Sequence, residues 1–267
     1  MIAGVTLPQP RAPFMWVETP WGPALQCESL NEFATHVFTA RGIDVPHADE
    51  GTGWLAIADW FGVPASHVWR LKQVHGVAAH TDALPCDGTW PDGDLLATDQ
   101  PEVAVAVRTA DCVPILLADR RTGVVAAVHA GWRGTVAGAA GRMVDVMRER
   151  FGTRADDLVA AVGPCIGPHV YEVGEGVIDA FAAAWPAQGE ARSWWTVRDT
   201  PGKYLLDLWT ATRDQLVAAG LDAAHIHVAH LCTATHAGVF HSWRANGAAA
   251  GRMVAAVSPR RSRSAGR

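Results

Sequence analysis

Apolar and polar residues alternate in blocks that predict both strands and helices. Apolar runs bounded by glycine, proline or polar residues are typical of strands, and such runs occupy residues 33–39, 67–76, 103–107, 158–163 and 225–232. Residues 55–61 have the spacing of a short amphipathic helix instead. Strands and helices therefore follow one another along the chain.

The clearest helix begins after residue 134. Apolar residues recur with the helical period at Val136, Ala140, Met143, Val144, Met147 and Phe151. Thr135 is placed as its N-cap and Gly152 lies just past its end. Residues 171–185 and 205–219 predict two further helices, the second ending at Gly220 as its C-cap.

Residues 107–119 and 124–134 are predicted to form two strands of one hairpin. If Ala118 pairs with Gly123 across the intervening loop, antiparallel pairing brings Cys112 opposite His129. Directly opposed residues lie about 4.5 to 5.5 Å apart. A slip of one residue would turn one of the two side chains to the other face of the sheet. The hairpin therefore predicts a thiol and an imidazole side by side.

Strands interleaved with helices, together with at least one hairpin, predict an α+β (mixed α/β) fold. The chain of 267 residues is long enough to bury a large core. No flexible linker interrupts the apolar pattern between residues 25 and 255. We expect an N-terminal extension at 1–24, one catalytic domain at 25–257 and a basic, disordered tail at 258–267.

The charge and the cysteines restrict the classes of function. The net charge is −5 and includes four arginines of the tail, so the remainder of the chain carries −9. An acidic body argues against a nucleic-acid groove. The first 16 residues contain three prolines and predict neither a signal peptide nor a membrane span. Five cysteines without a C-x-x-C pair suit a reducing compartment, so we expect a cytoplasmic protein that binds neither nucleic acid nor membrane.

Cys112 and His129 allow two kinds of chemistry. Zinc accepts thiolate and imidazole ligands, and a catalytic zinc site has three protein ligands and an open fourth position. His75, at the end of the 67–76 segment, would complete the set, although the hairpin brings together only the other two. The same pair could instead act as a cysteine nucleophile and its general base.

Residues around the hairpin suggest how a substrate would be held. The turn after His129 contains Trp132 and Arg133 and leads into the predicted helix, whose N-terminus favours anions. Asp111 is the candidate general base; in a regular strand it would face away from Cys112, so it would have to act from a bulge. Trp132 and Trp243 are the tryptophans closest to this chemistry, among twelve in the chain.

A histidine-rich segment near the C-terminus is a weaker candidate. Its members are His225, His227, His230, Cys232, His236 and His241. Two of these histidines share one face of the 225–232 strand, which suggests a second metal site. Alternation on a half-exposed strand explains the pattern without a metal.

Six segments together resemble the YfiH family, also called the laccase-domain or polyphenol-oxidase-like family. They are KQVHG (72–76), TADCVPILLAD (109–119), AAVHAGWRGT (126–135), GPCIGPHVYEVG (163–174), DLWTATRDQLVAAG (207–220) and CTATHAGVFHSWRANGAAAGRM (232–253). The resemblance covers about residues 35 to 257. It implies a single domain with central β-sheets flanked by helices, similar to the catalytic domain of the cytotoxic-necrotizing-factor deamidase.

The resemblance also implies an activity and a site. Family members are described as purine nucleoside phosphorylases, acting on nucleosides and methylthioadenosine, that also deaminate adenosine. Their metal is held by one cysteine and two histidines, which implies His75, Cys112 and His129 here, with zinc as the expected ion and copper as the alternative. The substrates implied are purine nucleosides and phosphate.

The N-terminal part departs from the family pattern. The usual TR-GG-S stretch and the Leu-Asn-Leu-Gly segment are replaced by FTARGIDVPHADEGTG, in which Arg41 is the candidate for the family arginine. SWRANG holds one arginine, Arg244, where many relatives have two in succession. We predict that the substrate is bound by Arg133, Trp132, Arg41, Arg244 and Cys165.

Four functions compete at this point. The first is the metal-dependent phosphorylase and deaminase, and it is the one that the motifs favour. The second is a cysteine hydrolase or amidase that edits peptidoglycan precursors, with Cys112 as nucleophile. The third is a copper-dependent polyphenol oxidase, which the sequence opposes, because it holds one H-x-H pair where multicopper sites need several. The fourth is a non-enzymatic nucleoside-binding protein.

Overall fold

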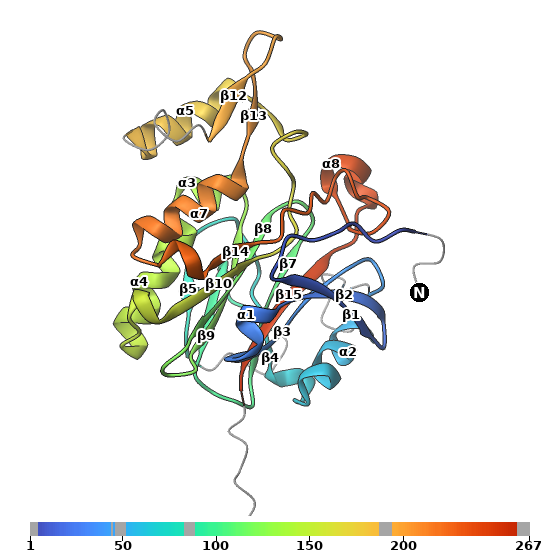
Figure 1. Cartoon of the computed structure of the whole chain (residues 1–267), viewed down its shortest axis with the longest axis vertical. Helices are drawn as coiled ribbons and strands as arrows, with labels where there is room; N and C mark the ends of the chain where they lie inside the picture. The colour runs from blue at the N-terminus through green and yellow to red at the C-terminus, as the bar shows by residue number, and fades with distance from the viewer. Residues whose placement is uncertain (1–4, 44, 46–51, 83–88, 187–193, 261–267) are drawn as a thin grey trace, which may run out of the picture.

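The computed structural model describes residues 5–43, 45, 52–82, 89–186 and 194–260, and in it the strands form two large sheets and one small sheet (Figure 1). The first sheet has the order β1 (Phe14–Thr19), β2 (Gly22–Cys27), β3 (Ala34–Thr39), β15 (Met253–Pro259), β7 (Ala104–Thr109) and β4 (Val68–Trp69). The second has the order β14 (Ile226–Val228), β10 (Leu158–Val162), β8 (Val113–Asp119), β9 (Val125–Ala130), β6 (Leu95–Thr98) and β5 (Ala79–His80). The third consists of β11 (Glu172–Gly174), β13 (Lys203–Leu206) and β12 (Trp195–Val197).

Helices flank the strands in the described part of the chain. They are α1 (Glu28–Asn31), α2 (Thr52–Phe61), α3 (Trp132–Val136), α4 (Ala139–Phe151), α5 (Glu175–Ala184), α7 (Leu208–Ala218) and α8 (Trp243–Asn246). Single 3₁₀ turns lie at Ala65–His67, Ala155–Asp157, Ala223–His225 and Gly247–Ala249. This arrangement is the mixed α/β single domain that the sequence predicts. Among the described helices, none is both long and apolar enough to cross a bilayer.

The core is divided into layers by the two large sheets. One cluster of apolar side chains fills the space between them and includes Phe38 and Val107 of the first sheet and Leu116 of the second. A second cluster packs the other face of the second sheet against α4, α5 and α7, and a third packs the first sheet against α2. Strands covered on both faces consist of continuous apolar runs, and every residue of β8 is buried.

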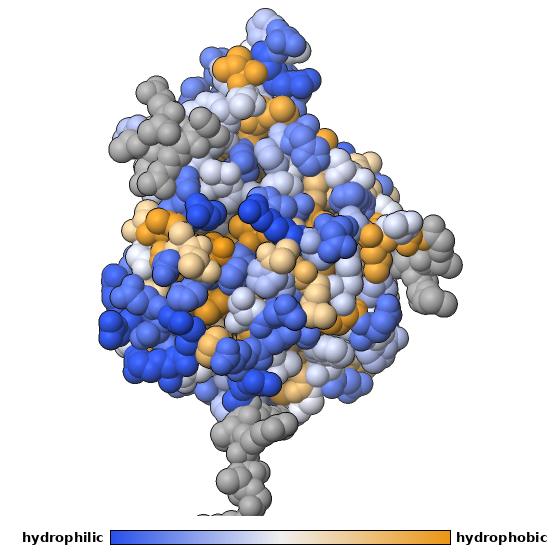
Figure 2. Space-filling model, in the orientation of Figure 1, coloured by the Kyte–Doolittle hydropathy of each residue, from blue (hydrophilic) through white to orange (hydrophobic). Residues whose placement is uncertain are grey.

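The helix predicted from residue 135 begins elsewhere. The chain forms the short α3 first, and Gly138, at φ 78°, separates it from α4. Thr135 is therefore inside α3 and not an N-cap, and its hydroxyl donates to the Gly131 carbonyl at 3.0 Å. Gly152 ends α4 as predicted, at φ 66°. The polar face of α4 lies on the left flank of the molecule, where Figure 2 shows hydrophilic residues gathered.

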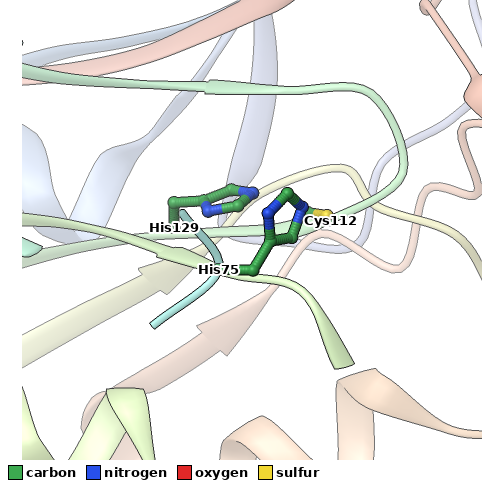
Figure 3. A group of neighbouring side chains, drawn as sticks. All are labelled: His75, Cys112 and His129. Carbon is green, nitrogen blue, oxygen red and sulfur yellow. The ribbon is translucent and has the colours of Figure 1, made fainter. Parts of the chain in front are cut away.

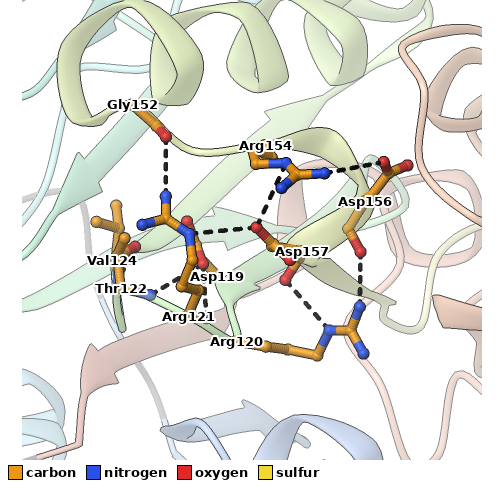
Figure 4. Close-up of polar contacts among 9 residues, drawn as sticks. All are labelled: Asp119, Arg120, Arg121, Thr122, Val124, Gly152, Arg154, Asp156 and Asp157. Atoms are coloured by element: carbon orange, nitrogen blue, oxygen red, sulfur yellow. Dashed lines mark hydrogen bonds and ion pairs between the residues drawn. The ribbon is translucent and has the colours of Figure 1, made fainter.

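The predicted hairpin forms in part. Residues 107–109 belong to β7 of the first sheet, so the predicted 107–119 strand is wrong over its first part, and only β8 pairs with β9, in a register two residues from the predicted one. Ala118 pairs with Val125 and Pro114 with His129. The loop is longer than predicted because one carboxylate oxygen of Asp119 accepts the N–H groups of Arg121 and Thr122, at 2.8 and 3.0 Å (Figure 4). Arg121 is also tied to Asp157 and to the Gly152 carbonyl, which fixes the loop against the end of α4. Since side chains alternate with a period of two, this shift preserves the face on which each residue of β8 and β9 lies, but it does not apply to Cys112, which precedes β8.

Other predicted strands are shorter than expected. The segment 67–76 contributes only β4, and 225–232 contributes only β14. The boundary at residue 24 falls within β2, and β1 pairs with β2 along its whole length. Of the predicted basic tail, Ser258 and Pro259 belong to β15, and residues 261–267 lie outside the described residues.

Candidate metal centre and cavity

The structure brings together His75, Cys112 and His129. Their ligand atoms all lie within 4.8 Å of one another, and the two imidazole rings meet edge to face at a centroid distance of 4.9 Å (Figure 3). His129 is buried, whereas His75 is exposed. Among the described residues, these three form the only group of His, Cys, Asp or Glu side chains with the geometry to hold a metal ion. The C-terminal histidine segment therefore forms no second centre of this kind within the described residues.

Each member of the cluster comes from a different part of the fold. His129 lies on β9, and Cys112 lies in the link between β7 of the first sheet and β8 of the second. His75 lies in the loop between β4 and β5, at φ 62°. Asp111, immediately before the cysteine, also has a positive φ of 91°. Such conformations are costly for residues other than glycine and tend to occur at functional sites.

The absence of a side chain at Gly131 leaves room for the side chains of His75 and Cys112. A Cβ atom at this position would lie 2.9 Å from Cδ2 of His75 and 3.0 Å from Sγ of Cys112. Both distances are shorter than an ordinary van der Waals contact. Glycine is therefore required here for lack of a side chain, not for its backbone freedom, since its φ is −73°.

Asp94 is a member of the site that the sequence analysis missed. It is fully buried, and one oxygen accepts a hydrogen bond from Nδ1 of His129 at 2.7 Å. The apolar run Leu95–Thr98 could have indicated it, because this run forms the strand that pairs with β9. Leu95 faces Val128 in that pairing, so Asp94 lies next to His129. Burial alone would raise the pKa of Asp94, but the His129 ring and the N–H groups of Gly76 and His75 outweigh it and lower that pKa.

The electrostatics favour a thiolate beside an imidazolium. Burial raises the pKa of Cys112, but His129 and His75 more than offset this and lower it to about 6. Burial lowers the pKa of His129, yet the thiolate and Asp94 raise it to about 9. Since the thiolate is the form that binds metals and attacks carbonyl groups, the cysteine is prepared for either reaction.

The cluster lies in the wall of a cavity of about 480 Å³. Four arginines line it, Arg108, Arg133, Arg244 and Arg252, together with the aromatic residues Trp132, Tyr171 and Trp243. Three of the guanidinium groups lie over these rings, at 4.2 Å for Arg133 on Trp132, 5.3 Å for Arg244 on Tyr171 and 5.8 Å for Arg252 on Trp243. The cavity is thus cationic within an acidic chain.

Asp111 is the only carboxylate residue among the described residues that line the cavity. Within the described residues, no carboxylate forms an ion pair with Arg133, Arg244 or Arg252. Asp111 lines the cavity, but its oxygens accept the hydroxyl of Thr233 and the backbone N–H of Arg244, the latter at 2.6 Å. An anion is the ligand that such a cavity favours.

The structure places two of the predicted substrate-binding residues outside the cavity lining and gives Asp111 hydrogen-bond partners of its own. Arg41 does not line the cavity; its guanidinium donates to the Phe240 carbonyl at 3.1 Å and to the Asn246 side chain at 3.0 Å. Cys165 is fully buried behind the cavity wall, where its sulfur accepts the indole N–H of Trp209 at 2.8 Å. Asp111 has both oxygens engaged, so its geometry favours holding Arg244 in place over accepting a substrate proton.

The predicted anion site at a helix N-terminus is also changed. The helix that follows Gly131 is α3, only five residues long, and the longer α4 begins seven residues farther along. A helix this short contributes little dipole. Arg108 and Arg252, which the sequence analysis missed, supply cationic side chains instead. Arg133, Arg244 and Trp132 line the cavity, and their contact with a substrate remains a prediction.

Fold and site together define a mixed α/β protein with one Cys/His₂ cluster of metal-binding type in a cationic cavity. The chain belongs to the family described as multi-copper polyphenol oxidoreductase laccase, whose model matches residues 52–260. The YfiH-family resemblance drawn from the motifs is thereby confirmed.

Individual relatives cover most of the chain. A protein of Deinococcus radiodurans named purine nucleoside phosphorylase is 39% identical over 256 residues, which are 96% of this chain and 94% of the relative. Adenosine deaminase RL5, from an unknown prokaryotic organism, is 39% identical over 240 residues, 86% of this chain and 85% of its own. The crystal structure of YfiH from Bacillus licheniformis superposes with a TM-score of 0.79 at 29% identity, covering 89% of this chain and 96% of that one.

Proposed function

We propose that this protein is a metal-dependent purine nucleoside phosphorylase that also deaminates adenosine. The observation that carries the proposal is the position of the His75, Cys112 and His129 cluster in the wall of a cavity with arginine and aromatic residues. The names of the relatives support the same two activities. A cytoplasmic location is part of the proposal.

The donor set fits zinc. One thiolate and two imidazoles are a common set for this ion, and all three residues line the cavity, so a fourth ligand position would be open to a substrate. Copper would accept the same donors. The bound ion would polarise a substrate oxygen or lower the pKa of a water molecule at that fourth position.

The cavity residues would hold a nucleoside and an anion together. Arg133 is exposed, and its guanidinium would bind phosphate by charge-assisted hydrogen bonds. Trp132 and Trp243 offer ring faces for a planar base. In phosphorolysis a phosphate oxygen forms a bond to C1′ of the ribose while the bond from C1′ to the base nitrogen breaks, and the base leaves with a proton. In deamination water adds to C6 of adenosine and ammonia leaves.

Positioning accounts for much of the catalysis expected here. Holding phosphate and nucleoside in one cavity converts a bimolecular reaction into one within a complex. Burial raises the pKa of Tyr171, and the negative charge of the Cys112 thiolate adds to this, so that it reaches about 12 and the phenol stays protonated at neutral pH. Tyr171 can therefore donate a hydrogen bond to the substrate.

The oxidase that the family description suggests is a poorer match to this site. Multicopper oxidation needs several histidine-rich centres within one protein, whereas the described residues provide a single cluster of three ligands. We therefore do not propose polyphenol oxidation as the main activity.

A second candidate function has one specific observation in its favour. Asp94 is hydrogen-bonded to His129, and His129 in turn interacts with the Cys112 thiol. The three could therefore act as orienting carboxylate, general base and nucleophile. This is the arrangement of a cysteine hydrolase or amidase, as in the predicted editing of peptidoglycan precursors. A hydrolase of that kind does not need His75, whereas a metal centre does.

The decisive experiment measures turnover of adenosine and inosine, with and without phosphate, by zinc-loaded protein. The variants are His129→Ala, His75→Ala and, as a matched control, His227→Ala on β14 of the same sheet as His129. We expect phosphate-dependent release of the base that is lost in the first two variants and retained in the control. A chelator should abolish it as well.

Two results would contradict the proposal. Zinc-loaded protein that leaves both nucleosides intact would exclude phosphorolysis and deamination. Activity on an amide substrate that survives the chelator and His75→Ala, but not Cys112→Ala, would favour the cysteine hydrolase.

A further inference from the structure

One buried carboxylate contacts both histidines of the cluster. Oδ1 of Asp94 accepts the ring N–H of His129 at 2.7 Å and the backbone N–H of His75 at 3.0 Å. Oδ2 accepts the backbone N–H groups of Gly76 at 2.7 Å and Val74 at 3.2 Å. The aspartate is fully buried, so these groups compete with no water for it.

We propose that Asp94 is the positioning residue of the metal centre, presenting Nε2 of His129 to the ion and holding the backbone of His75 in its left-handed conformation. Both imidazoles would then be aligned before a metal binds. This inference rests on the proposed metal-dependent function, and it adds a residue that contacts neither the ion nor the substrate.

The tautomer of His129 follows from the hydrogen bond that its ring forms. A neutral imidazole has one N–H and one nitrogen with a free lone pair. Since a carboxylate only accepts, Nδ1 must carry the proton toward Asp94, and the lone pair of Nε2 is left for the metal. A carboxylate partner of this kind fixes the tautomer of a histidine ligand and raises its basicity.

Pairing between strands fixes the position of the carboxylate itself. In the register of β6 and β9, Leu95 faces Val128, and the next pair along the ladder is Asp94 with His129. The backbone N–H of His129 donates to the Asp94 carbonyl at 2.9 Å. Their relative position is thus set by the second sheet and does not depend on a mobile side chain.

The loop that carries His75 needs support, because its φ of 62° is unfavourable for a residue with a side chain. Three successive N–H groups, from Val74 to Gly76, converge on Asp94. On the other side, the side chain of Gln73 forms two hydrogen bonds of 2.8 Å with the backbone of Arg108 on β7. The loop is therefore bonded to the first sheet through Gln73 and to the second through Asp94.

The experiment compares Asp94→Asn with Asp92→Asn. Asp92 is two residues away and has an exposed side chain paired with Lys72 at 3.2 Å, so it controls for the loss of one carboxylate from the same segment. Zinc affinity is measured by competition with a chromophoric chelator, and the ligand geometry by the absorption spectrum of the cobalt-loaded protein. We expect Asp94→Asn to bind zinc about tenfold to hundredfold more weakly and to change the cobalt spectrum, and Asp92→Asn to match the wild type.

A second measurement needs no variant and so does not depend on folding of Asp94→Asn. Nitrogen-15 NMR of the histidines in zinc-loaded wild-type protein identifies the nitrogen of His129 that carries the proton. We expect a proton on Nδ1 and zinc on Nε2. Zinc on Nδ1, or an Asp94→Asn variant that binds zinc as tightly as the wild type, would overturn the inference. Wild-type protein that binds neither zinc nor cobalt would instead refute the proposed function on which it rests.

Discussion

The close approach of Gly131 to two proposed ligands makes Gly131→Ala a sharp test of the metal centre. The added Cβ would lie 2.9 Å from the His75 ring and 3.0 Å from the Cys112 sulfur, whereas ordinary contacts begin at 3.4 Å. The ring and the thiol must therefore retreat by about 0.4 to 0.5 Å. Metal sites hold their bond lengths within about 0.2 Å, so a displacement of this size in two ligands cannot be absorbed without loss of affinity.

We expect Gly131→Ala to bind zinc at least about tenfold more weakly, a loss of about 1.4 kcal/mol or more. The metal-free protein should unfold with nearly the wild-type free energy, because φ −73° and ψ 177° suit alanine and the displaced atoms are the ends of side chains. The assay combines chelator competition for zinc with urea unfolding of the metal-free forms.

Gly134→Ala is the matched control within the same turn. A Cβ there would meet only atoms at 3.5 to 3.7 Å, and the residue lies inside α3. Its zinc affinity should be unchanged and its stability equal or higher by about 0.5 to 1 kcal/mol, because alanine favours helix over glycine. Wild-type affinity in Gly131→Ala, or an equal loss in both variants, would refute the argument from local crowding.

Three further predictions concern titration and the role of Asp111. His36 is fully buried, and burial lowers its pKa from 6.5 to about 4. Between pH 6.5 and pH 4 only the unfolded chain takes up this proton, so the free energy of unfolding falls by about 3 kcal/mol as the pH drops through this range. In urea unfolding of metal-free protein, His36→Gln should lack this part of the decline. The same dependence of the unfolding free energy on pH in both proteins would contradict the prediction. Alkylation of Cys112 in metal-free protein, followed by mass spectrometry, should be half-maximal near pH 6 and be prevented by zinc; a midpoint near pH 9 would show an ordinary thiol. In Asp111→Asn the amide oxygen can accept the N–H of Arg244 and the amide nitrogen can donate to the Thr233 hydroxyl. We therefore expect kcat to fall less than about threefold, whereas loss of a general base would lower kcat about a hundredfold or more.

The hairpin shows how far sequence patterns reach. The apolar pattern predicts β8 and β9, and the proximity of Cys112 to His129 is correct. The two residues are not a strand pair, however, because Cys112 lies before β8 and His129 pairs with Pro114. The predicted register fails by two residues because the Asp119 side chain bonds to the loop backbone and lengthens the turn. The thiol and the imidazole still meet, because the link between β7 and β8 places Cys112 beside the end of β9.

The missed residues of the site share a physical cause. Asp94 reaches His129 and Gln73 reaches Arg108, in each case across 35 residues of sequence. Contacts over such separations depend on which strands become neighbours, and an apolar pattern does not specify neighbours. Similarly, Gly138 breaks the predicted long helix through its backbone conformation, which the period of the apolar residues around it does not reveal.

The link at residues 110–112 carries the chain from one sheet to the other, since β7 belongs to the first and β8 to the second. Cys112 lies in that link, His129 in the second sheet, and His75 in a loop bonded to both. An ion bound by all three residues would cross-link the two sheets. Because the unfolded chain has no such site, each tenfold rise of free metal above the dissociation constant would add about 1.4 kcal/mol to folding. The supply of the ion in the cell would then influence how much folded protein persists, alongside the residues of the core.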